Sequence, residues 1–274
     1  MSAPADVTHL LADWPDPTAA SIALVDGADV VATGGVIARV SRIASISKVI
    51  AALAVLIAAE EGTVDLDEPA GPPGATVRHL LAHASGLDFD EHRSIAAVGK
   101  RRIYSNAGIE QLADHLAARA AMPFEQYQAE AVLGPLGMAD TVLRGSPAHS
   151  VWSNVADLTR LARELLAPTL IAAETLAEAT TVQFGDLAGV IPGLGRFDPA
   201  PWGLGFELKG AKSPHWTAPA NDASTFGHFG GTGTFLWVDP TLGLAAVAIS
   251  GTDYGPWALD VWPPTSQALI DLAR

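Results

Sequence analysis

The chain has 274 residues, enough for one large domain or two ordinary ones enclosing a catalytic cleft. It contains 16 Lys and Arg against 30 Asp and Glu, and the resulting net charge of −14 argues against a nucleic-acid partner. Cysteine is absent, which excludes disulfides, thiolate metal sites and a cysteine nucleophile. The hydrophobic share of 49% with 17% charged residues indicates a packed globular core rather than disorder.

The beginning of the chain carries no export signal that we can identify. A secretory signal needs a basic start followed by about 7–15 apolar residues. The first basic residue here is Arg39, and five Asp precede it. The longest apolar run, residues 49–59, is far shorter than the roughly 20 residues that span a bilayer. We therefore expect a soluble, cytoplasmic protein that does not bind a membrane.

Segments with strand character lie at both ends of the chain. Residues 21–25 and 30–32 flank an Asp-Gly-Ala-Asp turn, a pattern typical of a hairpin. Strand signals return near the end of the chain, at residues 203–208, 234–238 and 244–250, each bounded by Gly, Pro or Asp.

The segments between these ends have helical character. Residues 45–60 are apolar on nearly every face, which is typical of a helix buried in the middle of a protein. Further segments with helical spacing are 76–84, 109–121, 123–132, 155–166 and a closing helix at 265–273.

This order of elements predicts two domains in an α+β protein. One is a sheet domain built from both termini, residues 1–65 and 200–274, and the other is a mainly helical domain inserted between them, residues 66–199. We expect the functional site in the cleft between the two domains.

The first motif that can carry chemistry is Ser45-Ile46-Ser47-Lys48, at the start of the apolar helix. A spacing of three places Ser45 and Lys48 on one helix face, with the N–H groups of the helix N-terminus nearby. A buried lysine has a lowered pKa and can take the proton of the serine hydroxyl, which would activate it without a histidine. The alternative is structural, with Ser45 capping the helix and Lys48 reaching solvent along its stem.

The second motif is Tyr104-Ser105-Asn106. A tyrosine hydroxyl beside an ammonium group ionises more easily than in water and can pass a proton on. An asparagine amide can hold both a lysine and a substrate carbonyl. The structural alternative is a tyrosine packed at a helix entry with Asn106 as the cap.

The third motif is His228-Phe229-Gly230, which is followed by Gly231-Thr232-Gly233 and a β run. His-x-Gly is expected nearly once by chance in a chain of this composition, so only its position gives it weight. A strand edge this rich in glycine would let a substrate approach the backbone closely.

In this order the motifs resemble those of the serine β-lactamase and penicillin-binding-protein superfamily, on the side of class C β-lactamases, D-Ala-D-Ala carboxypeptidases, D-aminopeptidases and family VIII carboxylesterases. The resemblance implies a β-lactamase/transpeptidase-like fold, an α/β sandwich with an inserted all-α domain and an antiparallel sheet flanked by helices. It extends from about residue 21 to the C-terminus through segments 62–69, 76–87, 104–108, 135–141, 202–206 and 227–233.

The resemblance also implies roles for the first two motifs. Ser45 would be the acylated nucleophile, and Lys48 with Tyr104 would form a coupled base. Asn106 would orient Lys48 and the substrate. Tyr104 would then protonate the leaving group, and water would hydrolyse the acyl-enzyme with the same group as base. Such a mechanism needs no metal and no cofactor.

At the third motif the chain departs from the β-lactamase pattern. The resemblance places His228 and Gly230 at the substrate, and the N–H groups of Ser45 and Gly231 in an oxyanion hole. β-Lactamases usually have a lysine where this chain has His228, whose charge depends on pH near about 6.5. Phe229 replaces a small hydroxyl residue, which removes a donor to a carboxylate. We therefore expect β-lactam hydrolysis to be weak.

Other clusters have simpler structural explanations. His79 and His83 have a metal-compatible spacing, but neither an H-E-x-x-H motif nor a third ligand accompanies them. The basic run Lys100-Arg101-Arg102 is expected to be solvated surface, with recognition of an acidic substrate group as the alternative. No G-x-S-x-G elbow is present, which argues against an α/β-hydrolase.

We predict a serine hydrolase that forms an acyl-enzyme on a small-molecule ester or amide, foremost a carboxylesterase for small or medium acyl groups. The alternative enzyme is a D-amino-acid peptidase or amidase with weak β-lactamase activity. A missing export signal argues against a cell-wall carboxypeptidase, whose substrate lies outside the cell. A non-catalytic binding domain of the same fold is the alternative of another class, although such a domain would be expected to lose Ser45, Lys48 or Tyr104.

Overall fold

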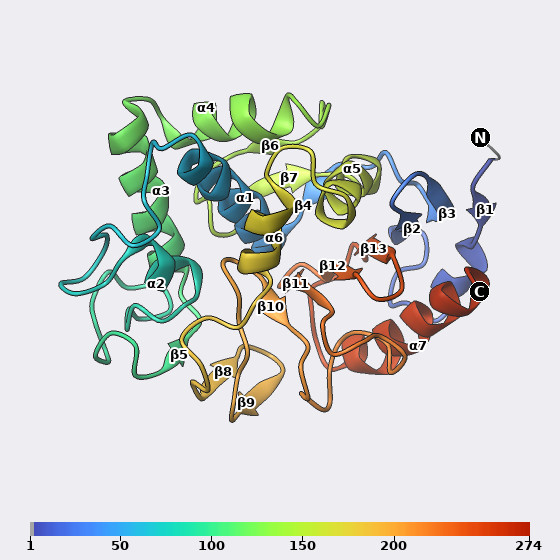
Figure 1. Ribbon diagram of the computed structural model, residues 1–274. Coiled ribbons are helices and arrows are strands. Elements are labelled where there is room, and N and C mark those ends of the chain that lie inside the picture. The colour runs from blue at the N-terminus through green and yellow to red at the C-terminus, as the bar shows by residue number, and fades with distance from the viewer. Residues whose placement is uncertain (1–2) are drawn as a thin grey trace.

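The computed structural model describes residues 3–274, and its largest element is one seven-stranded sheet covered by helices (Figure 1). The strand order is β1-β3-β2-β13-β12-β11-β10. β2 (Ser21–Asp26) pairs antiparallel with β13 (Leu244–Ile249), so segments from the two ends of the chain lie side by side. The other strands are β1 (Ala5–Asp6), β3 (Val30–Gly35), β10 (Glu207–Leu208), β11 (Phe226–Gly230) and β12 (Thr234–Asp239).

The remaining elements lie mostly between β3 and β10 in the sequence. Two three-stranded sheets are formed by β4 (Ser41–Arg42), β7 (Val151–Ser153) and β6 (Val142–Leu143), and by β5 (Arg102–Ile103), β8 (Gly189–Ile191) and β9 (Gly195–Phe197). The helices are α1 (Ser47–Glu60), α2 (Val77–Leu81), α3 (Asn106–Ala120), α4 (Phe124–Gln128), α5 (Val155–Leu166), α6 (Ala173–Ala179) and α7 (Trp257–Leu272). Shorter turns are η1 (Thr8–Leu11), η2 (Ala44–Ile46) and the π-helical η3 (Ala129–Leu133). The predicted α+β class is confirmed.

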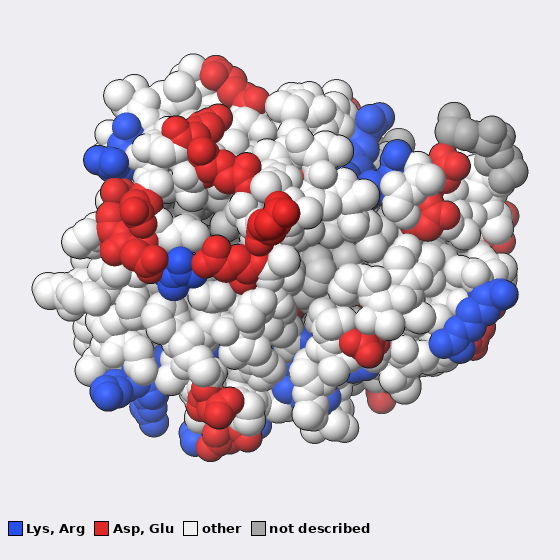
Figure 2. All heavy atoms as spheres, viewed as in Figure 1, with Lys and Arg blue, Asp and Glu red and all other residues white. Residues whose placement is uncertain are grey.

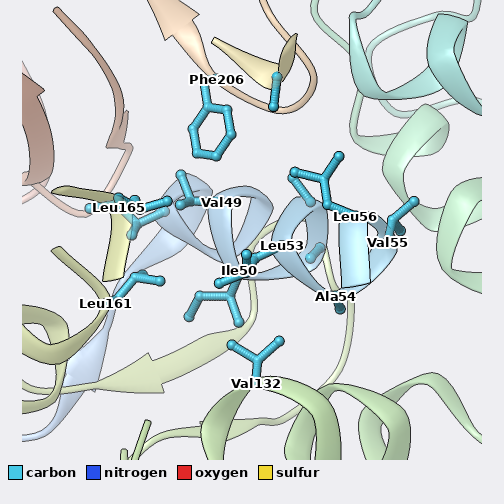
Figure 3. Packing of buried hydrophobic residues seen from close by; sticks show 14 of the residues in the cluster. Val49, Ile50, Leu53, Ala54, Val55, Leu56, Val132, Leu161, Leu165 and Phe206 are labelled. Atoms are coloured by element: carbon cyan, nitrogen blue, oxygen red, sulfur yellow. The ribbon is translucent and has the colours of Figure 1, made fainter. Parts of the chain in front are cut away.

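Helix α1 runs through the middle of the molecule, as its apolar sequence predicted. Every residue from Ser47 to Ala58 is buried, and apolar side chains surround the helix (Figure 3). Phe206, Leu161 and Val132 approach it from three different segments of the chain. Within residues 3–274, neither α1 nor any other helix combines the length and apolarity needed to cross a bilayer.

The central strands separate two hydrophobic cores. Ile22 and Leu24 of β2 belong to the core that includes α7, whereas Ala23 and Val25 belong to the core around α1. Successive side chains of a strand point to opposite faces, so a strand that is apolar at every position must be covered on both faces. Burial on both faces is what makes this sheet the middle layer of a sandwich.

Several short elements were not predicted. The sequence pattern predicted neither helix α6 nor the two small sheets. Strands of two or three residues are too short to show an alternation of apolar and polar side chains. The strand expected at 203–208 forms only at its last two residues. The helix expected at 123–132 is wrong as one α-helix, because it changes to π-helical geometry at Ala129.

Two helix boundaries also differ from expectation. The helix predicted over 76–84 ends at Leu81, and His83 follows with a left-handed φ of 53°. The closing helix begins at Trp257 rather than at residue 265. Pro263 and Pro264 lie inside it, and because proline usually ends or begins a helix, the sequence pattern did not predict the two turns before them.

Gly205 gives a test of the packing around α1. Its φ is +88°, and a Cβ at this position would overlap the Cβ of Ala52 on α1. We predict that Gly205→Ala lowers the free energy of unfolding by about 3 kcal/mol, because it combines left-handed strain with overpacking of the core. Gly62→Ala is the matched control: its φ is +75°, but nothing lies within 4 Å of the added Cβ, so the loss should be about 1 kcal/mol. Urea unfolding measures both values, and equal losses would contradict the packing explanation.

Candidate active site

Ser45 and Lys48 lie where the chain enters α1. Ser45 is the middle residue of η2 and is partly exposed, whereas Lys48 in the first turn of α1 is only 1% exposed. The helix was expected to begin at Ser45, but the serine instead lies in the 3-10 turn before it. Ala44, directly before Ser45, has a left-handed φ of 45°, a conformation that is costly for a residue with a Cβ.

The amine of Lys48 makes three polar contacts. Its Nζ lies 2.6 Å from Oδ1 of Asn106, 2.8 Å from the backbone oxygen of Ala148 and 3.4 Å from Oγ of Ser45. A neutral amine has two N–H groups and one lone pair. The two close oxygens can accept only, so they take both N–H groups and leave the lone pair for the serine hydroxyl.

Burial favours the neutral form of this amine. Loss of hydration lowers the pKa of Lys48 from 10.5 to about 7, although the carboxylates of Asp90 and Glu110 counteract part of that effect. A substantial share of the Lys48 amine is therefore unprotonated at neutral pH, in contrast to an exposed lysine. The structural alternative, in which Lys48 reaches solvent, is wrong.

Tyr104 lies against Lys48 and is also buried. The Lys48 Nζ is 4.7 Å from the centre of the Tyr104 ring. Burial raises the pKa of the Tyr104 hydroxyl, and the nearby Ser45 hydroxyl lowers it to a smaller extent. The Tyr104 oxygen forms no well-directed hydrogen bond within the described part of the chain. Tyr104 is therefore a protonated phenol at neutral pH rather than a phenolate.

Asn106 begins α3 and is held from two sides. Its Nδ2 donates to Oδ1 of Asp90 at 2.7 Å, and its backbone N–H donates to the Phe89 oxygen at 2.6 Å. Because Nδ2 is occupied by a carboxylate, Oδ1 must face Lys48. Ser105, rather than Asn106, caps the helix by accepting from the Gly108 N–H. The sequence reasoning missed Asp90, and no spacing signal in the sequence marks it.

The third motif forms an open edge of the large sheet. β10 pairs only with Phe226 and Gly227, so residues 228–230 pair with β12 on one side alone. Gly230 is required by close packing, because a Cβ there would overlap the Ile43 oxygen and Thr234 Oγ1, whereas the space beside Gly231 is open. This arrangement matches the strand edge expected from the sequence.

His228 is buried and neutral. Its Nδ1 lies 2.6 Å from the backbone oxygen of Phe229, so Nδ1 carries the proton and donates it, while Nε2 is an acceptor without a partner among residues 3–274. Burial, helped by the charge of Lys48, lowers the pKa of His228 to about 4. Position 228 therefore supplies no cation at neutral pH.

His83, whose spacing from His79 is compatible with a metal site, has a structural role instead. The ring is buried 4.7 Å from that of Tyr104, and its Nδ1 accepts from the Ser105 N–H, which fixes the turn that carries the second motif. His79 instead stacks on Phe184. No group of three or more metal-binding side chains occurs among residues 3–274.

The basic run is divided by its surroundings. Lys100 and Arg101 are exposed, as expected. The prediction of solvated surface is wrong for Arg102, which is buried and donates to the backbone oxygens of Ala82, Gln183 and Ala200. These three bonds satisfy the guanidinium inside the protein and connect β5 to the neighbouring segments.

The predicted residues surround one cavity of about 220 Å³. Ser45, Tyr104, His228 and Gly231 line it, together with an apolar wall that includes Phe229. Lys48, Asn106 and Gly230 do not line the cavity, although Lys48 contacts Ser45 and Gly230 lies next to Gly231. All three motifs therefore meet at one place, although 183 positions separate Ser45 from His228.

Comparisons with known proteins bear on the fold of the chain. A sequence model of the family described as Beta-lactamase matches residues 18–265. The crystal structure of a beta-lactamase (Mb2281c) from Mycobacterium bovis is 48% identical, with a TM-score of 0.94 over 96% of this chain and 97% of that one. EstCE1, a hydrolase with promiscuous acyltransferase activity, has a TM-score of 0.75 over 92% of this chain and 94% of its own. Its 16% identity shows a shared fold alone.

A curated protein is similar over a shorter stretch. The D-alanyl-D-alanine-carboxypeptidase/endopeptidase AmpH of Escherichia coli (strain K12) is 30% identical over 145 residues. That match covers 39% of this chain and 38% of AmpH. Together the comparisons confirm the expected β-lactamase/transpeptidase-like fold.

Asp90→Asn tests the electrostatic setting of Lys48. The amide can still accept from Asn106 Nδ2, but the negative charge that raises the Lys48 pKa is lost. We predict that the rise of kcat/KM with pH, centred near pH 7 in the wild type, moves to lower pH. The exposed Asp114→Asn on α3 is the charge-matched control and should leave the profile in place. A profile that is unmoved in Asp90→Asn would contradict this assignment.

Lys48→Met tests the energetic consequence of burying the amine. The pKa of Lys48 is lower in the folded than in the unfolded state. The contribution of Lys48 to the free energy of unfolding therefore decreases as pH falls from about 10.5 to about 7, and stays constant below about pH 7. We predict that Lys48→Met raises the free energy of unfolding at pH 7 by about 1–4 kcal/mol. The gain should shrink toward pH 10, while hydrolysis falls about 10²- to 10⁴-fold. Exposed Lys100→Met is the control, and a Lys48→Met protein less stable than wild type at pH 7 would refute the prediction.

Proposed function

The chain belongs to the Beta-lactamase family, and we propose that it is a serine hydrolase that forms an acyl-enzyme on Ser45 and acts on carboxylic esters with small or medium acyl groups. Members of this family are serine hydrolases that share the β-lactamase/transpeptidase-like fold. The observation that carries the proposal is the position of the buried Lys48 amine, whose Nζ lies 3.4 Å from the Ser45 Oγ and whose pKa is lowered by burial to about 7.

Acylation would begin with proton transfer from Ser45 Oγ to Lys48 Nζ as Oγ attacks the substrate carbonyl carbon. The negative charge that develops on the carbonyl oxygen needs donors. The N–H groups of Ser45 and Gly231 are suited to this, because neither has an acceptor in the described part of the chain and both residues line the cavity. Loss of one such donor typically slows a reaction about 10²- to 10³-fold.

The leaving group would receive its proton through Tyr104. The raised pKa of Tyr104 keeps its hydroxyl protonated, so it can donate to the departing oxygen and recover a proton from Lys48. A water molecule would then attack the acyl carbonyl and transfer its proton back along the same route, which releases the acid and regenerates Ser45. In this scheme Lys48 is the base and Tyr104 the relay.

The third motif supports esters over peptides and β-lactams. D-Peptides and β-lactams carry a carboxylate near the bond that is cleaved. The neutral His228 offers no charge to it, and Phe229 offers no hydroxyl. Esters without such a carboxylate lose nothing from these changes. The partial similarity to AmpH keeps a D-amino-acid peptidase as the second candidate.

Intact-protein mass spectrometry after a fluorophosphonate probe tests the nucleophile. We predict one adduct on the wild type, no adduct on Ser45→Ala, and an unchanged adduct on Ser224→Ala, which alters an exposed serine. An adduct that persists in Ser45→Ala would refute the mechanism. A panel of p-nitrophenyl esters, D-Ala peptides and nitrocefin then ranks the substrates, and faster turnover of nitrocefin than of esters would reverse the proposed order.

A further inference from the structure

A second cavity adjoins the one at Ser45. The two share three walls, Phe89, Tyr104 and Pro192, and the second is the larger, at about 310 Å³. Because Tyr104 and Phe89 border both cavities, the second cavity lies directly beside the one at Ser45. We call this second cavity the side groove, lined by β5, β8, β9 and the segment before β5.

The side groove is apolar and exposed. Phe89, Ile95 and Val190 line it, with exposed fractions of 40%, 51% and 56%. They are three of the eight large hydrophobic residues that are exposed within residues 3–274. A concentration of exposed apolar side chains next to a catalytic cavity is typical of a surface that a ligand covers.

Two exposed arginines line the side groove. Arg101 and Arg196 line it, both are exposed, and neither forms an ion pair within the described residues, in contrast to Arg78 and Arg93. Figure 2 shows basic and acidic side chains together along the edge of the molecule where Figure 1 places β5, β8 and β9. No carboxylate among residues 3–274 comes within 4 Å of either guanidinium.

We propose that the side groove binds an apolar segment of the substrate that ends in a carboxylate, with the segment against Phe89, Ile95 and Val190 and the carboxylate between Arg101 and Arg196. The proposal rests on the proposed function, because it places the reacting carbonyl at Ser45. Arginine presents a planar fork of donors that suits a carboxylate.

The side groove relates the neutral state of His228 to the positions of Arg101 and Arg196. His228 supplies no cation next to the reacting bond, yet the chain retains two cations at the far side of the cleft. A carboxylate adjacent to the scissile bond would be unpaired, whereas one separated from it by several carbons reaches the arginines. The alternative weighed for the run Lys100-Arg101-Arg102, recognition of an acidic group, therefore applies to Arg101 alone.

Matched esters test the proposal, and they distinguish the acyl side from the leaving-group side. On the acyl side, mono-p-nitrophenyl adipate is compared with p-nitrophenyl hexanoate, which has the same chain length without the carboxylate. On the leaving-group side, 4-acetoxybenzoate is compared with 4-methylphenyl acetate. We expect a higher kcat/KM for the anionic member of one pair, and a preference that weakens as salt is raised.

Variants assign this preference to the arginines. Arg101→Gln and Arg196→Gln should each reduce the ratio of kcat/KM between the anionic and neutral esters about fivefold, which is the upper range for a single exposed ion pair. Arg274→Gln is the matched control, because it removes the same charge from an exposed arginine at the C-terminus, and should leave both rates unchanged. Equilibrium binding of the same esters to Ser45→Ala gives the preference without turnover.

The outcomes separate the two proposals. Ser45-dependent ester hydrolysis with equal kcat/KM in both pairs would overturn the side-groove assignment and leave the proposed function intact. An anionic preference that Arg274→Gln reduces as much as Arg101→Gln does would also overturn it. Absence of hydrolysis would refute the proposed function, while tighter binding of an anionic ester to Ser45→Ala, lost on substitution of Arg101 and Arg196, would still establish the side groove as a carboxylate site.

Discussion

The buried amine of Lys48 is the constraint on which the rest of the site depends. An ammonium group without water is unstable unless other groups replace its hydration, and among residues 3–274 two oxygens and the Ser45 hydroxyl do so. The apolar sequence of α1 causes this burial, because the helix is covered on all sides and its first turn carries the amine inside with it. The same residues that form the core therefore adjust the protonation of Lys48.

The partners of Lys48 come from segments far apart in the chain. Asn106 is fixed by Asp90 and by the backbone oxygen of Phe89, and its turn is fixed by His83. Ala148 contributes only a carbonyl group, at the end of a turn that Ser146 stabilises by accepting from the Ala148 N–H. Small displacements of these loops would change both the direction of the lone pair and the electrostatic potential at Lys48, so much of the fold serves to hold this position.

The sequence was sufficient for the motifs but not for their support. Ser45, Lys48 and Tyr104 could be singled out by their side-chain chemistry and spacing, whereas His228 could be singled out only by its position after the first two motifs. The Ala148 oxygen could not, because a backbone carbonyl carries no residue-specific signal. Long elements such as α1 were predictable from periodicity, whereas the two small sheets, including the strands that border the side groove, are too short to produce a pattern. What the sequence cannot show is mainly tertiary hydrogen bonding.

Placement of charge then distinguishes this site from one built to hold a carboxylate beside the reacting bond. A cation close to Lys48 would lower the Lys48 pKa further by repulsion, in the same way that Lys48 contributes to the lowered pKa of His228. A neutral His228 avoids that repulsion, so the pKa of the amine reflects burial, which lowers it, and the charges of Asp90 and Glu110, which raise it. Cations on the far side of Tyr104, at Arg101 and Arg196, lie in solvent, where screening weakens their effect on Lys48. Substrate charge can therefore be recognised there without disturbing the base.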